Sequence, residues 1–130
     1  FLNNEVVIGQ IWGGEVYQAN EENPNIMYIY PKEGATFWVD NMVIPASTRN
    51  IDYAHAFIDF MCRPDVAKMN CEYVGYATAN VEAQKMLDEK TRNHKAVYPD
   101  KADIDRGEFQ ADVGETIIIY EKYWEMLKTQ

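Results

Sequence analysis

A tryptophan and an aspartate stand two residues apart in the stretch Phe37-Trp38-Val39-Asp40. The stretch follows a Pro-Lys-Glu-Gly turn and is mostly apolar, so it predicts a buried strand. Because side chains alternate across a strand, Trp38 and Asp40 are expected on the same face. An ionised carboxylate removed from water needs a cationic partner. An aromatic plane beside that charge suits an organic ammonium ion, which makes this pair a candidate ligand site.

Trp12 is a second aromatic residue in an unusual position. It ends the apolar run 5–12 and is followed at once by Gly13 and Gly14. Ligands of parallel sheets bind beyond the carboxyl ends of the strands, and Trp12 is expected at such an end. The pattern leaves two interpretations of Trp12 and Trp38 open, a shared ligand site and simple core packing.

Residue patterns typical of catalysis do not occur in the sequence. No serine or cysteine stands in a G-x-S-x-G context, and neither a G-x-G-x-x-G nor a P-loop pattern is found. His55 and His94 are isolated and far apart, so we interpret them as structural or solvated side chains. Cys62 and Cys71 have no neighbours that would complete a metal site. The sequence therefore predicts a protein without enzymatic activity, cofactor or metal.

The charge balance excludes some partners. The 130 residues include 12 Lys+Arg and 21 Asp+Glu, a formal net charge of -9. Such acidity repels nucleic acid and anionic membranes and favours cationic partners, although it also serves solubility. The hydrophobic content of 47% is enough for the core of one domain. No apolar run approaches the roughly 18 to 20 residues of a membrane span, and the start at Phe1 suggests a processed or truncated product.

The first part of the chain predicts a strand, helix, strand unit. Residues 5–12 form an apolar run typical of a buried strand, residues 15–22 indicate a short helix, and residues 26–30 indicate a second strand. This order is typical of a parallel sheet. The expected fold class is therefore α/β.

Helices are predicted for much of the remaining chain. Apolar spacing and cap residues indicate helices at 51–63, from Pro64 to about residue 73, and at 81–88 with Asn80 as the cap. An apolar stripe predicts an amphipathic C-terminal helix whose aromatic members pack. The stripe is spaced four, three, four, three and consists of Val113, Ile117, Tyr120, Trp124 and Leu127.

A series of motifs in order along the chain is more specific than any one of them. The series consists of Ile11-Trp12, Tyr30-Pro31-Lys32-Glu33-Gly34, Phe37-Trp38-Val39-Asp40, Val43-Ile44-Pro45-Ala46, Arg63-Pro64-Asp65-Val66-Ala67, Gly75-Tyr76-Ala77-Thr78-Ala79-Asn80, Tyr98-Pro99-Asp100 and Asp112-Val113-Gly114. With these motifs the chain resembles the polyamine-binding proteins of bacterial ABC transporters for spermidine and putrescine. The resemblance covers the C-terminal portion of the family's chain.

The resemblance implies an α/β protein of the two-lobed type II periplasmic-binding-protein fold, with this chain contributing pieces of both lobes. In that family the polyamine lies in a cleft between the lobes. By resemblance, residues 1–38 and 85–130 belong to the C-terminal lobe and residues 39–84 to the N-terminal lobe. The chain would cross between the lobes near Trp38 and return after about Asn80.

The same resemblance implies roles for individual side chains. Trp12 and Trp38 correspond to aromatic walls for the methylene chain of a polyamine and its ammonium groups. Asp40 corresponds to a carboxylate that pairs with an amine, while Tyr76 and Gln110 correspond to further polar or aromatic contacts.

Glu15 departs from the family pattern. It lies three residues after Trp12, at a position where some putrescine-preferring members carry an aspartate and spermidine-preferring members do not. The longer side chain leaves the preference between the two polyamines open.

The function implied by the resemblance is that of the solute-binding component of a polyamine importer. Such a protein lies outside the cytoplasm, in the periplasm or as a cell-surface lipoprotein, and its partners are the polyamine and a membrane permease, not nucleic acid. The alternatives are a receptor of the same fold for another small cation or an iron complex, a hydrolase or transferase on an α/β scaffold, and a protein-interaction domain.

The partial coverage of the family has its own consequences. Because further site residues of the family lie outside this chain, we expect the 130 residues alone to bind polyamine weakly or not at all. Uncovered apolar surface and sheet edges also predict self-association of this fragment.

Overall fold

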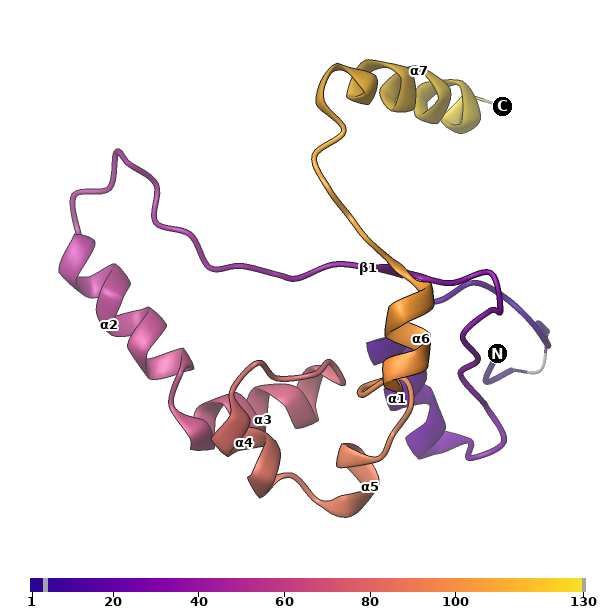
Figure 1. The fold of residues 1–130 in the computed structure, drawn as a ribbon, viewed down its shortest axis with the longest axis horizontal. Coiled ribbons are helices and arrows are strands. Elements are labelled where there is room, and N and C mark those ends of the chain that lie inside the picture. The colour runs from indigo at the N-terminus through magenta and orange to yellow at the C-terminus, as the bar shows by residue number, and fades with distance from the viewer. Residues whose placement is uncertain (4, 130) are drawn as a thin grey trace.

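Helices make up most of the regular structure in the computed structural model, which describes residues 1–3 and 5–129 (Figure 1). The helices are α1 (Gly13–Glu22), α2 (Ile51–Met61), α3 (Pro64–Val74), α4 (Val81–Met86), α5 (Glu89–Arg92), α6 (Lys101–Arg106), the 3-10 turn η1 (Gly114–Thr116) and α7 (Ile117–Lys128). Each helix predicted from the sequence is present, with ends that differ by one to several residues. Among the described residues, no helix combines the length and the apolar composition that crossing a membrane requires.

Local signals explain where several helices begin and end. The side chain of Asn80 accepts a hydrogen bond from the Ala83 N–H at 3.0 Å, which confirms its predicted role as the cap of α4. Pro64 occupies the first turn of α3, where its missing N–H costs nothing. The same helix ends at Gly75, whose φ of 75° is a left-handed conformation that favours glycine.

The described residues contain one sheet, a parallel pair of two-residue strands, β1 (Thr36–Phe37) and β2 (Glu108–Phe109). Thr36 pairs with Glu108 and Phe37 with Phe109. The sheet is parallel, as expected, but it joins segments far apart in the sequence instead of the two ends of a strand, helix, strand unit.

The strands predicted at 5–12, at 26–30 and around Trp38 and Asp40 are wrong for this structure. No strand is assigned at 5–12 or 26–30, and the predicted strand at 37–40 is a strand only at Phe37, the last residue of β1. A strand requires a neighbour for its backbone N–H and C=O groups, and the described part of the chain offers them none. Residues 26–30 nevertheless keep the alternating burial of a strand, with Met27 and Ile29 exposed at 76% and 73%.

Asp40 is exposed rather than buried, so the expectation of a charge inside a strand is also wrong. The chain leaves β1 after Phe37 and runs without regular structure to α2 (Figure 1). Val39 and Val43 of this connection are exposed at 66% and 80%. The connection is apolar, as the prediction of burial assumed, but among the described residues nothing covers Val39 and Val43.

A small core joins α1, α3 and the segment around α5. Its buried members are Tyr17, Cys71, Leu87 and Val97, and Tyr98 packs against them. The hydroxyl groups of Tyr17 and Thr91 share a hydrogen bond of 2.8 Å, and the Thr91 side chain is 1% exposed. This bond ties α1 to α5 across 74 residues of sequence.

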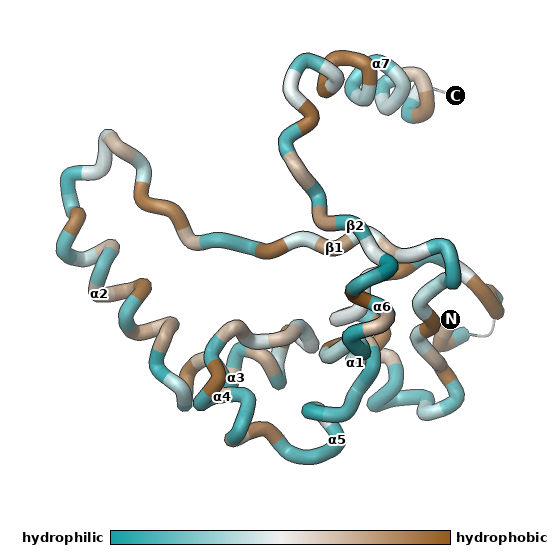
Figure 2. Tube along the Cα trace, in the orientation of Figure 1, coloured by the Kyte–Doolittle hydropathy of each residue, from teal (hydrophilic) through white to brown (hydrophobic). Residues whose placement is uncertain are grey.

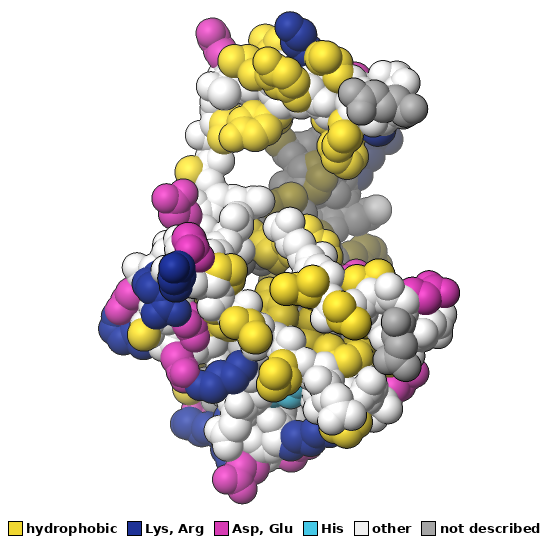
Figure 3. Space-filling model, turned by 90° about the vertical axis from the view of Figure 1, so that its right-hand side faces the viewer, with side chains coloured by type: hydrophobic (Ala, Val, Ile, Leu, Met, Phe, Trp, Pro, Cys, Tyr) yellow, Lys and Arg dark blue, Asp and Glu magenta, His cyan; other side chains and the backbone are white. Residues whose placement is uncertain are grey.

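The helices α2 and α7 stand apart from this core. Figure 1 shows α7 at the end of an extended segment after β2, and Figure 3 shows its hydrophobic side chains gathered at the top of the molecule. Figure 2 shows hydrophobic positions recurring along α2, along α7 and in the connection after β1. Neither helix has a buried residue, and Tyr120 and Trp124 are exposed at 62% and 59%. The C-terminal helix is confirmed, but the expected packing of its aromatic stripe does not occur here.

We expect the substitution Tyr17→Phe to lower the free energy of unfolding by about 1 to 2 kcal/mol, because it removes one hydrogen-bond partner of the buried Thr91 hydroxyl and changes the shape little. Denaturant titration followed by circular dichroism measures the change. Tyr73→Phe is the matched control, since Tyr73 is 83% exposed and should leave the stability unchanged. Equal stabilities of the two variants would contradict the role of this bond.

Candidate functional site

Trp12 is held by the first turn of α1. It is the N-cap residue of that helix, and Gly13 and Gly14 directly after it are buried. A Cβ on Gly13 would lie 2.5 Å from the carbonyl oxygen of Ala96, and one on Gly14 would lie 2.4 Å from the ring of Tyr76. Only glycine permits both approaches. The glycine pair therefore brings Trp12 and Tyr76 to the same place.

Trp38 completes a wall of three aromatic rings. It directly follows β1, and its ring meets that of Trp12 edge to face, with centroids 4.6 Å apart and planes at 73°. The ring of Tyr76 also meets that of Trp38 edge to face, with centroids 6.4 Å apart and planes at 64°. Edge-to-face contacts of this kind are favourable and fix the relative orientation of the rings.

Two carboxylates lie beside this wall. Glu15 is in the first turn of α1, and Asp40 follows Trp38 by two residues. Burial raises the pKa of the Tyr76 phenol, the negative charges of Glu15 and Asp40 raise it further, and a backbone contact with Gly14 opposes them. None of the ion pairs within residues 1–3 and 5–129 involves either carboxylate. The site thus has negative charge and aromatic surface side by side.

Gln110 approaches from β2. Its backbone N–H donates a hydrogen bond of 2.7 Å to the carbonyl of Phe37, the residue before Trp38. Gln110 is exposed. The pairing of β1 with β2 therefore places this residue next to the aromatic wall, although the two segments are far apart in the sequence.

Tyr28 extends the aromatic surface and was missed in the sequence. Its ring meets Tyr30 edge to face at 5.0 Å, and Tyr30 stacks on Phe37 at 5.9 Å. Burial raises the pKa of Tyr28, and its proximity to Tyr76 raises it further. Tyr28 and Tyr30 are the half-buried tyrosines of the alternating segment 26–30, and this alternation was the signal that could have identified them.

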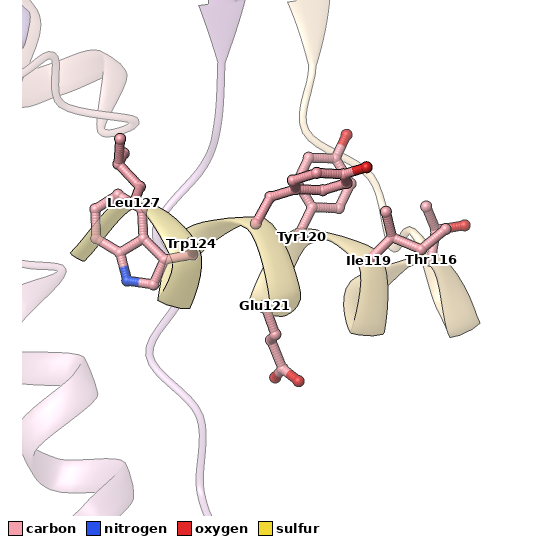
Figure 4. Close-up of a pocket in the computed structure, with 7 residues that line it drawn as sticks. Thr116, Ile119, Tyr120, Glu121, Trp124 and Leu127 are labelled. Atoms are coloured by element: carbon pink, nitrogen blue, oxygen red, sulfur yellow. The ribbon is translucent and has the colours of Figure 1, made fainter. Parts of the chain in front are cut away.

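A hollow of about 740 Å³ lies elsewhere, along α7. It is lined by Thr116, Ile119, Tyr120, Glu121, Tyr123, Trp124 and Leu127. Figure 4 shows that these side chains all come from α7 and the residue before it, with Glu121 pointing away from Tyr120. The hollow is the exposed apolar side of one helix, without the convergent polar groups of a ligand site.

The structure brings most of the site residues predicted from the sequence together in one place. Trp12, Trp38 and Tyr76 form one aromatic wall, with Glu15 and Asp40 close enough to influence Tyr76. Gln110 is brought to the neighbouring strand by its backbone. We call the aromatic wall together with these two carboxylates the aromatic corner. It has the chemistry to hold a small organic cation, because aromatic faces attract cations and carboxylates pair with them.

Comparisons with known proteins place the chain in a family. Residues 1–99 match the family described as bacterial extracellular solute-binding protein. The chain is similar to the spermidine/putrescine-binding periplasmic protein of Salmonella typhimurium, with 41% identity over 98% of this chain and 37% of that protein. It is also similar to the putrescine-binding periplasmic protein PotF of Escherichia coli, with 31% identity over 75% of this chain and 28% of that protein.

A solved structure shares the fold. The substrate-binding protein PotD of a spermidine/putrescine ABC transporter from Streptococcus pneumoniae superposes with a TM-score of 0.75 and 37% sequence identity, over 98% of this chain and 40% of that one. The chain thus spans between 28% and 40% of the length of these three relatives. The two-lobed fold expected from the sequence is that of these relatives. The chain belongs to the family of bacterial extracellular solute-binding proteins.

Proposed function

We propose that this chain is the C-terminal portion of an extracytoplasmic polyamine-binding protein that delivers spermidine or putrescine to the permease of an ABC importer. The observation that carries the proposal is the corner of Trp12, Trp38 and Tyr76 beside the carboxylates of Glu15 and Asp40. The similarity to spermidine/putrescine-binding proteins supports it. The protein acts by binding and release, without chemical conversion of the ligand.

The composition of the corner fits the chemistry of a polyamine. A polyamine alternates ammonium groups with methylene spacers, so its site requires carboxylates beside aromatic surfaces. One cation over an aromatic face contributes roughly 0.5 to 2 kcal/mol, whereas micromolar binding requires about 8 kcal/mol. Several groups must therefore act together, and Asp40 with Trp38 and Glu15 with Trp12 supply two such pairs.

The proposal includes a crossing between two lobes. Residues 1–38 and 85–130 belong to the C-terminal lobe, and residues 39–84 belong to the N-terminal lobe. The long irregular connection from β1 to α2 supports a crossing, because it carries the chain away from α1 and α6 before α2 begins (Figure 1). The chain then comes back to α1 at α3, where Cys71 shares the small core with Tyr17. Trp38 and Asp40 then lie at the hinge side of the cleft. Closure of the lobes around the ligand presents a composite surface that the permease recognises.

The substitution Asp40→Asn tests the carboxylate directly. In the full-length protein that carries this sequence, we expect the dissociation constant for spermidine or putrescine to rise about thirtyfold, or roughly 2 kcal/mol, because a charge partner of the bound amine is lost. Isothermal titration calorimetry measures the change. Asp59→Asn in the exposed face of α2 is the matched control and should bind as the unaltered protein does. Equal affinities of the two variants would show that Asp40 takes no part in binding.

The 130-residue chain by itself should bind polyamine weakly or not at all, because its aromatic corner is open and the chain spans only 37% of the length of the Salmonella typhimurium relative. Trp12, for example, is 52% exposed in this chain. Titration of spermidine and putrescine into this chain measures the affinity. A micromolar dissociation constant would overturn the idea that both lobes are required.

Self-association of the 130-residue chain is a further expectation. In solution a second copy is the available cover for α7, where Ile118, Tyr123 and Leu127 are exposed at 66%, 62% and 64%. Sedimentation velocity over a range of concentrations should show a shift from monomer to dimer. Leu127→Glu should weaken the shift, whereas Glu125→Gln, at a residue that does not line the hollow of α7, should not. A clean monomer at every concentration contradicts this expectation.

A further inference from the structure

His94 makes a specific set of hydrogen bonds in the turn between α5 and α6. The backbone N–H of Ala96 donates to the His94 Nδ1 at 3.3 Å. The carbonyl of His94 accepts the N–H groups of Val97 at 3.0 Å and Tyr98 at 2.8 Å. Because Nδ1 is an acceptor, the imidazole is neutral and carries its proton on Nε2. The bond from a side chain to the N–H two residues later has the geometry that asparagine and aspartate use in turns.

The same turn contacts the start of α1 in two places. The ring of His94 meets that of Tyr17 edge to face, at 5.1 Å and 79°. The carbonyl of Ala96 lies so close to Gly13 that a Cβ there would come within 2.5 Å. Gly13 directly follows Trp12. The turn therefore supports the backbone from which the first aromatic wall of the site projects.

The groups around His94 favour its neutral form. Burial lowers the pKa of His94 and the charge of Lys90 lowers it further, while the charge of Glu21 raises it. Lys90 and Glu21 form an ion pair at 2.5 Å, Glu21 coming from α1 and Lys90 from α5. The other titratable group against the ring is Tyr17. Burial and the charge of Lys90 thus disfavour the protonated form of His94. Protonation at Nδ1 would also remove the acceptor of the Ala96 N–H.

We propose that His94 is a positioning residue of the binding site, whose neutral Nδ1 holds the 94–96 turn against Gly13 and makes the placement of Trp12 dependent on pH. This inference rests on the proposed function. It goes beyond that function because it assigns a role to a residue that touches neither the aromatic corner nor its carboxylates, and because it couples ligand affinity to acidity.

The sign of the effect follows from the direction of the pKa. Since the folded state lowers the pKa of His94, the unfolded state binds more protons below about pH 6.5. Stability contributed by neutral His94 is therefore present above that pH and is lost as the pH falls through the lower value of the folded state. Affinity for a ligand that needs Trp12 in place should decline over the same interval.

The test compares three variants in the full-length protein that carries this sequence. His94→Asn keeps a side-chain acceptor for the Ala96 N–H but does not titrate, and His94→Ala removes the acceptor. His55→Asn on the exposed face of α2 is the matched control, since His55 and His94 are the two histidines of the chain. Putrescine and spermidine affinity by calorimetry and stability by denaturant titration are measured at pH 7.5 and pH 5.5.

We expect the dissociation constant of the unaltered protein and of His55→Asn to rise about three- to tenfold between pH 7.5 and pH 5.5, the range that one hydrogen bond covers. His94→Asn should match the unaltered protein at pH 7.5 and show no such rise. His94→Ala should bind three- to tenfold more weakly at both pH values.

Several outcomes overturn the proposal. If His94→Asn retains the pH dependence of affinity, another group is responsible. If stability depends on pH through His94 while affinity does not, His94 is only structural. If no protein binds putrescine or spermidine at pH 7.5, the proposed function fails, and the binding role of His94 fails with it. A loss of binding confined to pH 5.5 in proteins that retain His94 supports the proposal and leaves the proposed function intact.

Discussion

The close approach of the start of α1 to two other backbone segments is the constraint on which the candidate site depends. Gly13 lies against the carbonyl of Ala96, and Gly14 lies against the ring of Tyr76. Any side chain at either position would push α1 away from its neighbours, because an added Cβ has no space there. Trp12 would move with the helix. The aromatic corner is thus built by residues that have no functional groups of their own, and a small core with Tyr17 at its centre holds them in place.

The electrostatic arrangement of the corner favours a cation over an anion. Negative charge from Glu15 and Asp40 reaches Tyr76 strongly enough to raise its pKa, in addition to the effect of burial. Aromatic faces present negative potential as well, so the edge-to-face rings of Trp12 and Trp38 reinforce this field. An anionic ligand would be repelled by the carboxylates, and a purely apolar ligand would use only the aromatic surface. The proposed ligand, a linear polyamine with charges separated by methylene groups, would use both.

The sequence predicted the parts of the fold that local signals control. The cap at Asn80 and the proline at the first turn of α3 act within a few residues, and the structure has them where the sequence placed them. Strands were predicted poorly because an apolar run such as 26–30 becomes a strand only beside a partner, which is a property of distant residues. Resemblance identified the residues that form the corner. The alternation in segment 26–30 indicates which face Tyr28 takes, but its proximity to Tyr76 depends on residues far away in the sequence.

Closure must supply what the open corner lacks. Two unit charges about 4 Å apart attract by about 1 kcal/mol in water and by about 4 kcal/mol in the lower effective dielectric near a protein surface. Asp40 and Glu15 are exposed in this chain, so each would bind an ammonium group at the weak end of this range. Covering the corner with a second surface excludes water and strengthens every contact in it at once. Under the proposed function, ligand affinity and lobe closure would draw on the same free energy, because the carboxylates that are exposed in this chain would gain their full attraction for the ligand only on closure.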